Sequence, residues 1–550
     1  MTELCVDHSP SGYPATTLAA AIDAQSRARP GAPFLLTDAR DWTYAAVHEA
    51  SDRLATTLLA AGAGRGDPIA IAAPNSAEWA VTWLAAAKIG APVVALNVVY
   101  REREFEYMIN QSGARIVICA AEHGGFDFVA MLDGLRNRLP SVREFVFLGG
   151  AGFAGSRTWD DVSAGPADQA ALRRAGELIR PADPVVILYT SGTTGHPKGA
   201  LLTQASILAS ATAQVANFGL TSDDVAMGQL PFNHVGGVTC TLTAAMLAGS
   251  AVAVIPSFHP KVAARIITER RVSVFTGVPT MYAMMLGLPE FAETDTSSVR
   301  LCVVGGANLE PALADRITGS FPGVRLANLY GLSETSGACV ISAPDDDPRT
   351  LAETVGVPIG EFAVRVVDDS GAILAAGAEG ELQVSGECLA AGYLALPEEN
   401  DAVFRPGGWL ATGDMAVIRP DGHVELRGRR KEMYVRGGYN VYPAEIENFL
   451  AGQESVAMCA VIGIPHPMFG EVGRVYVVAE PGRRVDPADL IARCRSQLAD
   501  YKVPEEIVVV DELPLTPAGK IRKGVLRELA GTGHPDPIAP AIPHSTRKQD

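Results

Sequence analysis

The chain has few charged residues, few aromatic residues and no excess of basic ones. Charged residues make up 19% of its 550 positions, aromatic residues make up 6%, and the formal net charge is −17. An acidic surface of this kind disfavours nucleic acid or an anionic membrane as the main partner. Hydrophobic residues account for 48% of the chain, which is ordinary for a globular protein. We therefore expect small-molecule partners and no nucleic acid.

Cysteine is also scarce, with eight scattered residues and no CxxC spacing. This usage favours reduced, mostly buried thiols in a cytoplasmic protein over disulfides or metal ligands. The N-terminal stretch "MTELCVDHSPSGYPATT" lacks a basic segment followed by an apolar one, so no secretory signal is predicted. The oligomeric state is left open, with a homodimer as one alternative.

One uncharged run, "VGGVTCTLTAAMLAGSAVAVIPS" at residues 235–257, is long enough to cross a membrane. Gly249 and Ser250 divide it into a helix-like half and a Val-rich half that is typical of a strand. The run therefore predicts a buried helix followed by a buried parallel strand, and no transmembrane segment.

A chain of 550 residues is too long for one hydrophobic core and predicts two or more domains. Apolar runs such as "DPIAIAAP", "DPVVILYT" and "VRLCVVGGA" alternate with helix-length segments, which predicts parallel sheets covered on both faces. Shorter, glycine-rich strands follow and favour an antiparallel piece. The fold class is thus α/β, with a large N-terminal domain (1–428, barrel-like over about 355–425), a hinge (429–432), a mobile α+β C-terminal domain (433–530) and a disordered tail (531–550).

The stretch "TSGTTGHPKG", residues 190–199, directly follows a predicted buried strand. It is not a Walker A loop, because Pro197 replaces the second glycine and Gly199 replaces the hydroxyl residue after the lysine. Glycine amides, hydroxyl donors and one cation can nevertheless surround a phosphate chain. The predicted polyphosphate ligands are Thr190, Ser191, Gly192, Thr193, Thr194, Gly195 and Lys198.

Together with four later stretches, this loop resembles the adenylate-forming superfamily, which includes acyl-CoA synthetases, luciferases and the adenylation domains of peptide synthetases. The other four are "NLYGLSET" (328–335), "GWLATGD" (408–414), "RGRRKEMYVRGGYNVYPAEIE" (427–447) and "LPLTPAGKIRK" (513–523). They occur in the family's order, and the resemblance covers roughly residues 15–530. It implies that a carboxylate attacks the α-phosphate of ATP, giving an acyl-adenylate and pyrophosphate, and that the thiol of coenzyme A then displaces AMP.

The resemblance also implies roles for individual residues. Lys520 would bridge the incoming carboxylate and the α-phosphate, where a mobile cation neutralises two anions as they approach. Glu334 and Ser333 would bind Mg²⁺ through oxygen. Lys431 would be the hinge about which the small domain rotates between the two half-reactions.

The resemblance places the nucleotide and coenzyme A on further residues. Asp414 would accept hydrogen bonds from the ribose hydroxyls, Arg429 would reach the ribose or the phosphates, and Tyr330 would stack on adenine. The remaining residues expected at the nucleotide are Gly306, Ala307, Asn328 and Gly331, and those expected at coenzyme A are Gly437 and Gly438.

The expected acid pocket offers no charge for a substrate amine, which disfavours amino acids and favours a fatty, alicyclic or aryl acid. His234 is expected to line it, although a purely structural histidine is an equal alternative. The other residues expected there are Gly277, Val278, Pro279, Thr280, Gly305, Gly306, Gly331, Gly337 and Ala338.

Other functions stay open at this point. An acyl-AMP ligase that loads a carrier protein would use the same first half-reaction, and a non-catalytic nucleotide-binding protein is a weaker alternative. "GAGFAG" at residues 150–155 satisfies G-x-G-x-x-G, but no amphipathic run follows it, so a dinucleotide-dependent oxidoreductase is disfavoured.

Overall fold

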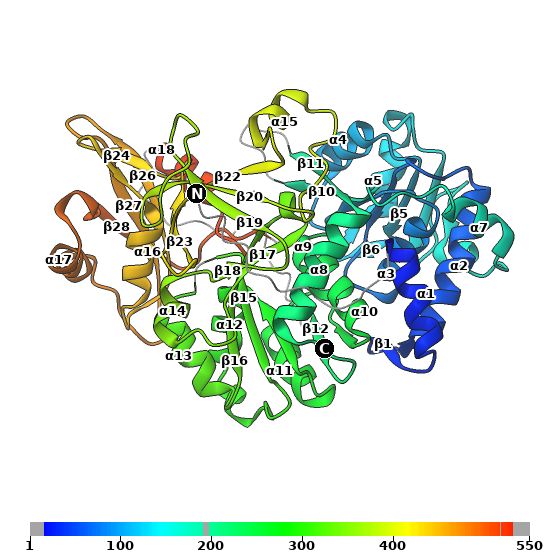
Figure 1. Ribbon diagram of the computed structural model, residues 1–550, viewed down its shortest axis with the longest axis horizontal. Helices are drawn as coiled ribbons and strands as arrows, with labels where there is room; N and C mark the ends of the chain where they lie inside the picture. The colour runs from blue at the N-terminus through cyan, green and yellow to red at the C-terminus, as the bar shows by residue number, and fades with distance from the viewer. Residues whose placement is uncertain (1–15, 191–196, 308, 517–518, 532–550) are drawn as a thin grey trace, which may run out of the picture.

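The structure is a computed structural model that describes residues 16–190, 197–307, 309–516 and 519–531. Figure 1 shows a large domain with two sheets of αβ layers, and a smaller domain at the end where β24, β26 and α17 are labelled. The predicted tail lies outside the described residues, apart from Gly531 at the end of the last helix.

The first large sheet has seven strands in the order β11-β10-β4-β3-β5-β8-β9. All its pairings are parallel except β10 with β11. Ile69 and Ile71 of β3 join one core while Ala70 and Ala72 join another, so the sheet is buried on both faces as predicted. The strands are β3 (Ile69–Ala72), β4 (Val93–Leu96), β5 (Ile116–Ala120), β8 (Glu144–Leu148), β9 (Arg157–Thr158), β10 (Pro184–Thr190) and β11 (Lys198–Thr203).

The second large sheet has nine strands in the order β18-β17-β16-β15-β14-β12-β13-β1-β2. The six strands β16, β15, β14, β12, β13 and β1 pair in parallel in that order. Antiparallel strands close both ends of the sheet, β17 and β18 at one end and β2 at the other. The carboxyl ends of β14, β15 and β16 therefore meet at one edge, where open α/β sheets bind ligands. The strands are β1 (Pro33–Leu36), β2 (Asp41–Thr43), β12 (Val225–Gly228), β13 (Ala251–Val254), β14 (Val274–Gly277), β15 (Leu301–Gly305), β16 (Arg325–Leu332), β17 (Gly337–Ile341) and β18 (Val357–Pro358).

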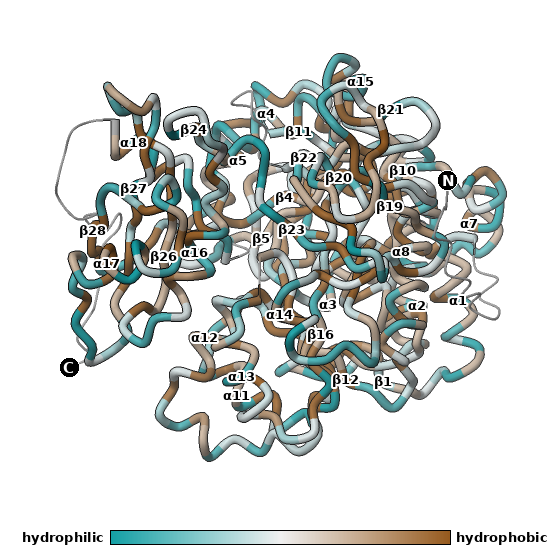
Figure 2. The backbone as a smooth tube through the Cα atoms, turned by 60° about the vertical axis from the view of Figure 1, so that its left-hand side comes forward, coloured by the Kyte–Doolittle hydropathy of each residue, from teal (hydrophilic) through white to brown (hydrophobic). Residues whose placement is uncertain are grey.

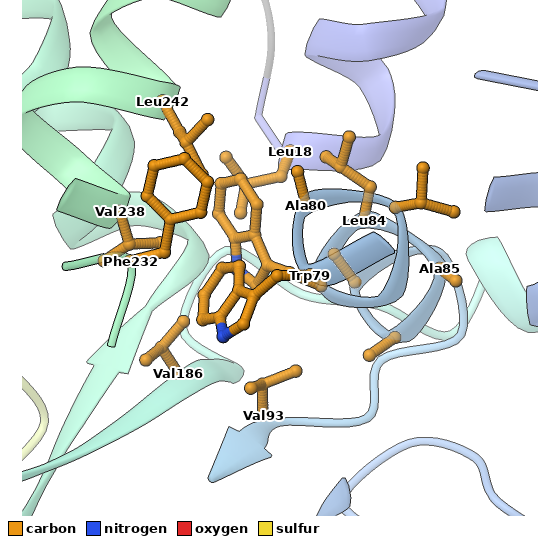
Figure 3. Packing of buried hydrophobic residues seen from close by; sticks show 14 of the residues in the cluster. Leu18, Trp79, Ala80, Leu84, Ala85, Val93, Val186, Phe232, Val238 and Leu242 are labelled. Carbon is orange, nitrogen blue, oxygen red and sulfur yellow. The ribbon is translucent and has the colours of Figure 1, made fainter. Parts of the chain in front are cut away.

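Helices cover these sheets and pack tightly between them. Figure 3 shows Trp79 of α3 beside Phe232, with ring centroids 5.6 Å apart, and Leu18 close by. Figure 2 colours the backbone by hydropathy, and many of its outer loops are teal, that is, hydrophilic. The helices of the large domain are α1 (Leu18–Ala28), α2 (Tyr44–Ala60), α3 (Ala77–Lys88), α4 (Glu102–Ser112), α5 (Phe128–Leu135), α6 (Trp159–Ser163), α7 (Gln169–Gly176), α8 (Gln204–Phe218), α9 (Val235–Gly237), α10 (Ala244–Ala248), α11 (Pro260–Glu269), α12 (Pro279–Leu286), α13 (Pro311–Ser320), α14 (Pro348–Glu353) and α15 (Pro397–Val403).

The uncharged run at residues 235–257 is buried, as predicted. It forms α9, a π-helical turn η2 (Val238–Thr243), α10 and then strand β13. In the described part of the chain, no helix is long and apolar enough to cross a membrane. The decoy "GAGFAG" does not open a helix, because the short strand β9 follows it before the five-residue helix α6 begins.

An antiparallel sheet follows the two parallel ones, as the change of pattern predicts. Its order is β19-β20-β22-β21, and β23 pairs with β22 across the turn at Asp421 and Gly422. The register places Asp414 of β22 opposite Arg429 of β23. The strands are β19 (Ala363–Val367), β20 (Glu379–Ser385), β21 (Phe404–Arg405), β22 (Trp409–Ile418) and β23 (Val424–Arg429).

The small domain has its own sheet, β25-β24-β27-β26 with β28 beside β27, and its own buried core. This matches the predicted small α+β unit, while the exact boundaries and the hinge at 429–432 stay predictions. Its elements are β24 (Tyr434–Arg436), β25 (Tyr439–Val441), α16 (Pro443–Ala451), β26 (Val456–His466), β27 (Gly470–Ala479), α17 (Pro487–Gln497), β28 (Glu506–Val510) and α18 (Lys523–Gly531).

The seven cysteines that the structure describes are all unpaired, and six of them are buried. Burial raises the pKa of thiols such as Cys240, to about 11. The prediction of reduced, mostly buried thiols is therefore confirmed for these seven, and Cys5 lies outside the described residues.

The hairpin of β16 and β17 tolerates no side chain at Gly331. A Cβ atom there would lie 2.0 Å from the carbonyl oxygen of Gly337, a backbone atom that cannot rotate away. We expect Gly331→Ala to cost about 1–3 kcal/mol of stability. We also expect about 10²-fold slower adenylate formation, because the hairpin carries Tyr330.

The matched control is Gly319→Ala in α13, where a Cβ atom meets nothing within 4 Å. It should leave the melting temperature and the activity near those of the parent. Equal effects of the two substitutions, in thermal unfolding and in ATP–pyrophosphate exchange, would contradict the analysis of the hairpin.

Candidate active site

The loops after β14, β15 and β16 form one continuous rim on the large domain. Val278 follows β14, Gly306 follows β15, and Glu334 lies in the turn η4 (Ser333–Thr335) after β16. The rim forms where it does because three parallel strands end at the same edge. The predicted residues Gly277 and Gly305 are the last residues of β14 and β15.

Lys520 reaches this rim from the small domain. A Cβ atom on Gly306 would lie 3.1 Å from Cε and 3.6 Å from Nζ of Lys520, so the lysine passes directly over the glycine backbone. Gly306 also has a φ of +79°, which favours glycine. Burial chiefly lowers the pKa of Lys520, Arg429 lowers it further, and Asp414 and Glu334 oppose the shift. The amine therefore lies among the predicted nucleotide residues.

Asp414, on the interior strand β22 of the antiparallel sheet, is held by two partners. It is only 5% exposed, accepts a hydrogen bond of 2.6 Å from the Tyr330 hydroxyl and lies 3.2 Å from Nε of Arg429. Burial raises the pKa of Asp414, and Arg429 and Tyr330 oppose the shift. The three predicted nucleotide residues thus form one group, joined by a hydrogen bond and an ion pair.

Glu334 and Lys198 both contact one tyrosine, Tyr393, the first at its hydroxyl and the second at its ring. The Tyr393 hydroxyl donates to Oε1 of Glu334 at 2.5 Å, and Nζ of Lys198 lies 5.4 Å from the centre of its ring. Nζ of Lys198 also lies 3.8 Å from Oε1 of Glu399. The phosphate-loop lysine and the expected metal ligand are therefore neighbours.

The chemistry of this group suits a magnesium ion that is shared with phosphates. In the described part of the chain, no three His, Cys, Asp or Glu residues are grouped to hold a metal ion by themselves. Glu334 and Ser333 can supply two oxygen ligands, and Mg²⁺ in nucleotide sites takes one or two protein ligands together with phosphate oxygens and waters. The donor set fits that mode of binding.

His234 caps the start of α9, and its Nδ1 accepts the backbone N–H of Gly236 at 3.2 Å. Burial, and then the positive charge of Lys520, lower the pKa of His234 to about 4. Its ring is therefore neutral near pH 7, with the proton on Nε2. His234 therefore has a structural role as a helix cap, and its Nε2–H remains available to donate to a ligand.

An apolar wall lies next to Lys520 and His234. Val278, Leu230 and Met281 form a buried cluster with Phe258 packed against it. A separate cavity of about 10 Å³, with room for no more than about one water, lies between the sheet and the π-helical turn, with Met227, Cys240, Thr241 and Thr276 among its lining residues. Gly331, Gly337 and Ala338 lie in the β16–β17 hairpin, and a Cβ atom on Gly337 would come within 2.7 Å of Oγ of Ser210 in α8.

Several predicted residues lie elsewhere or are occupied otherwise. Gly437 and Gly438 form the exposed turn between β24 and β25, and Figure 1 shows β24 at the outer end of the small domain. The Asn328 side chain donates to the carbonyls of Leu351 and Thr354, at 2.6 and 2.9 Å, and so holds the backbone. Ala307 is exposed on the rim and Lys431 is exposed beside Arg429.

The phosphate loop is only partly described. The hydroxyl of Thr190 donates to the carbonyl oxygen of Lys198 at 3.4 Å, across the β10–β11 pair. Ser191, Gly192, Thr193, Thr194 and Gly195 lie outside the described residues, so their predicted contacts with phosphate stay predictions.

Sequence reasoning missed Tyr393 and the residues that hold the Lys520 segment. Tyr393 stands in "LAAGYL", between the recognised stretches, and touches Glu334 across 59 positions. Nζ of Lys523 lies 2.7 Å from Glu432 and 2.8 Å from Glu447. The only sign of these ion pairs in the sequence was that Glu432 and Glu447 lie in the stretch 427–447 and Lys523 in the stretch 513–523.

Comparisons with known proteins agree with this geometry. The family model of AMP-binding enzymes matches residues 22–394, and that of the AMP-binding enzyme C-terminal domain matches residues 445–520. The chain is 36% identical to a 3-[(3aS,4S,7aS)-7a-methyl-1,5-dioxo-octahydro-1H-inden-4-yl]propanoyl:CoA ligase of Mycobacterium tuberculosis, over 93% of this chain and 99% of that protein. It is 33% identical to a feruloyl-CoA synthase of an Amycolatopsis species, over 89% and 94% of the two chains.

A solved structure gives the same result. The anthranilate CoA ligase AuaEII in complex with anthranoyl-AMP matches with a TM-score of 0.85 and 27% identity, over 93% of this chain and 97% of that one. The chain thus belongs to the adenylate-forming family of AMP-binding enzymes, and it is an AMP-forming acyl-CoA synthetase that adenylates a carboxylate and then forms a thioester with coenzyme A.

Proposed function

We propose that this synthetase activates a carboxylic acid that carries an alicyclic or aromatic ring. The wall of Val278, Leu230 and Met281 is apolar and offers no counter-charge, so it suits an apolar acid body. Relatives whose names specify ring-bearing acids support the same substrate class.

The adenylation step is assigned to residues on both domains. An oxygen of the acid attacks the α-phosphorus of ATP, the bond to the β-phosphate oxygen breaks, and pyrophosphate leaves. Lys520 neutralises the two approaching anions, and Lys198 holds the departing phosphates. Asp414 and Arg429 hold the ribose, with Tyr330 fixing Asp414, and His234 offers its Nε2–H to the acid.

Mg²⁺ is assigned to Glu334 and Ser333. When bound, the ion neutralises charge on the phosphate oxygens. Tyr393 keeps the Glu334 carboxylate in place by donating to Oε1, so that Oε2 stays available as a ligand. The ion and these roles are proposals that rest on the donor set described above.

The second half-reaction is assigned to a rotated small domain. The domain would turn about Lys431 in the 429–432 segment, take Lys520 away and bring Gly437 and Gly438 toward the acyl-adenylate. Their φ values of +58° and +89°, and the open space at Gly438, suit close passage of a thin pantetheine arm. A cytoplasmic location is proposed because the seven described cysteines are unpaired thiols, and a homodimer stays a prediction.

The observation that carries this assignment is the passage of Lys520 over Gly306. It brings the amine of the small domain to the rim where the large domain gathers Asp414, Arg429 and Glu334. A protein that only bound nucleotide would not need a cation from a second domain at that place.

The substrate class can be tested with a panel of acids. The full chain is incubated with ATP, Mg²⁺, coenzyme A and either an aryl, a bicyclic or a long-chain fatty acid, and AMP release and thioester are measured. We expect kcat/KM for the best ring-bearing acid to exceed that for the long-chain acid at least about tenfold, equivalent to about 1.4 kcal/mol. A preference for the long-chain acid would overturn the proposed substrate class without touching the reaction type.

The role of Lys520 can be tested on the separate half-reactions. Lys520→Ala should slow acid-dependent ATP–pyrophosphate exchange by about 10²- to 10³-fold, because one group that stabilises transition-state charge is lost. Conversion of supplied acyl-adenylate to thioester should stay within about twofold of the parent. Lys261→Ala, at a 65% exposed lysine of the large domain, is the control. Equal loss of both half-reactions by Lys520→Ala would refute the assignment.

The same residue predicts the pH dependence of adenylation. Its pKa is lowered from the usual 10.5, chiefly by burial, so the required ammonium is lost as pH rises, earlier than for an exposed lysine. Lys520→Arg should remove this alkaline decline, because a guanidinium stays charged. His234, with its pKa at about 4, should add no acidic limb above about pH 5. An alkaline decline that persists in Lys520→Arg would assign it to another group.

A further inference from the structure

One hydroxyl of the large domain contacts the segment that carries Lys520. Oγ1 of Thr280, the second residue of α12, donates a hydrogen bond to the carbonyl oxygen of Gly519 at 3.2 Å. A Cβ atom on Gly519 would lie 2.9 Å from this Oγ1 and 3.0 Å from Cγ2 of Val278. Gly519 also has a φ of +79°, so a side chain there is excluded both by conformation and by the contact.

Three described residues next to this contact, Thr516, Gly519 and Lys520, hydrogen-bond to one another. The backbone N–H of Thr516 donates to the Lys520 carbonyl at 2.6 Å, and the Lys520 N–H donates to Oγ1 of Thr516 at 3.0 Å. The N–H of Gly519 donates to the Thr516 carbonyl at 2.8 Å. Because these bonds connect Gly519 and Lys520 through Thr516, a hydrogen bond that fixes the Gly519 carbonyl also fixes the backbone of Lys520.

The other end of the segment is fixed to the small domain. Lys523, at the start of α18, pairs with Glu432, the last residue of the predicted hinge, and with Glu447 on α16. Its ammonium is largely buried between them, and the two carboxylates raise its pKa above the usual value against the effect of burial. The Lys520 segment therefore moves with the small domain, and Thr280 is its polar anchor on the other side.

We propose that Thr280 is a positioning residue for adenylation, whose hydroxyl docks the Gly519 carbonyl and so places the Lys520 amine over Gly306. The proposal rests on the role of Lys520 proposed above. The hydrogen bond exists only while the small domain lies against α12. The thioester step needs Lys520 to leave, so Thr280 should matter for the first half-reaction and be neutral for the second.

The test compares two substitutions that each remove one part of the threonine side chain. Thr280→Val keeps the branched shape and removes the hydroxyl, whereas Thr280→Ser keeps the hydroxyl and removes the methyl group. At saturating acid and ATP, we expect Thr280→Val to slow ATP–pyrophosphate exchange about five- to tenfold, as for loss of one buried hydrogen bond. Thioester formation from supplied acyl-adenylate should stay within about twofold, and Thr280→Ser should retain both rates within about twofold.

Thr318→Val, at an exposed threonine of α13, is the control for the Thr→Val substitution itself, and melting temperatures control for folding. Equal loss of both half-reactions in Thr280→Val, no loss in either, or the same loss in Thr280→Ser would each overturn the proposal. Lys520→Ala is measured in parallel. If it leaves exchange intact, the role of Lys520 fails; if exchange is lost there and kept in Thr280→Val, only the positioning role fails.

Discussion

The active site depends on a positive charge that one domain must deliver to the other. Burial lowers the pKa of Lys520, and Arg429 beside it lowers the pKa further. The carboxylates of Asp414 and Glu334, which belong to the large domain, oppose this shift and partly offset the loss of the ammonium form. The electrostatics of the site are therefore complete only when the small domain lies against the large one.

This constraint explains the backbone around the lysine. A long side chain can cross the rim only where the rim has no side chain, and Gly306 meets that need at the end of β15. The β16–β17 hairpin next to it is equally crowded, so Tyr330 and Asp414 stay aligned without help from a ligand. The parallel sheet provides the rigid support on which these short distances depend.

Much of this architecture could be predicted from the sequence. Parallel strands buried on both faces are uninterrupted apolar runs, and β3, β10 and β15 were recognisable for that reason. The residues in the recognised stretches also came together as predicted, in the case of Asp414, Arg429 and Lys520. Tyr393 could not be found in this way, and Thr280 was predicted only as a pocket residue, because their partners lie 59 and 239 positions away and no local pattern marks these contacts. The π-helical turn had no visible signal either, since its residues read as an ordinary buried helix.

The strength of the contact between the domains is limited by the reaction itself. A domain that must release Lys520 in every cycle cannot be held by a large apolar interface or a buried ion pair, since breaking a buried pair costs several kcal/mol. A neutral hydrogen bond such as that of Thr280 contributes only about 1 kcal/mol net. The ion pair of Lys523 with Glu447 lies instead within the small domain, where rotation does not break it, and the pair with Glu432 links α18 to the predicted hinge. Strong contacts thus keep α18 on the small domain, and a weak one selects where the neighbouring Lys520 docks.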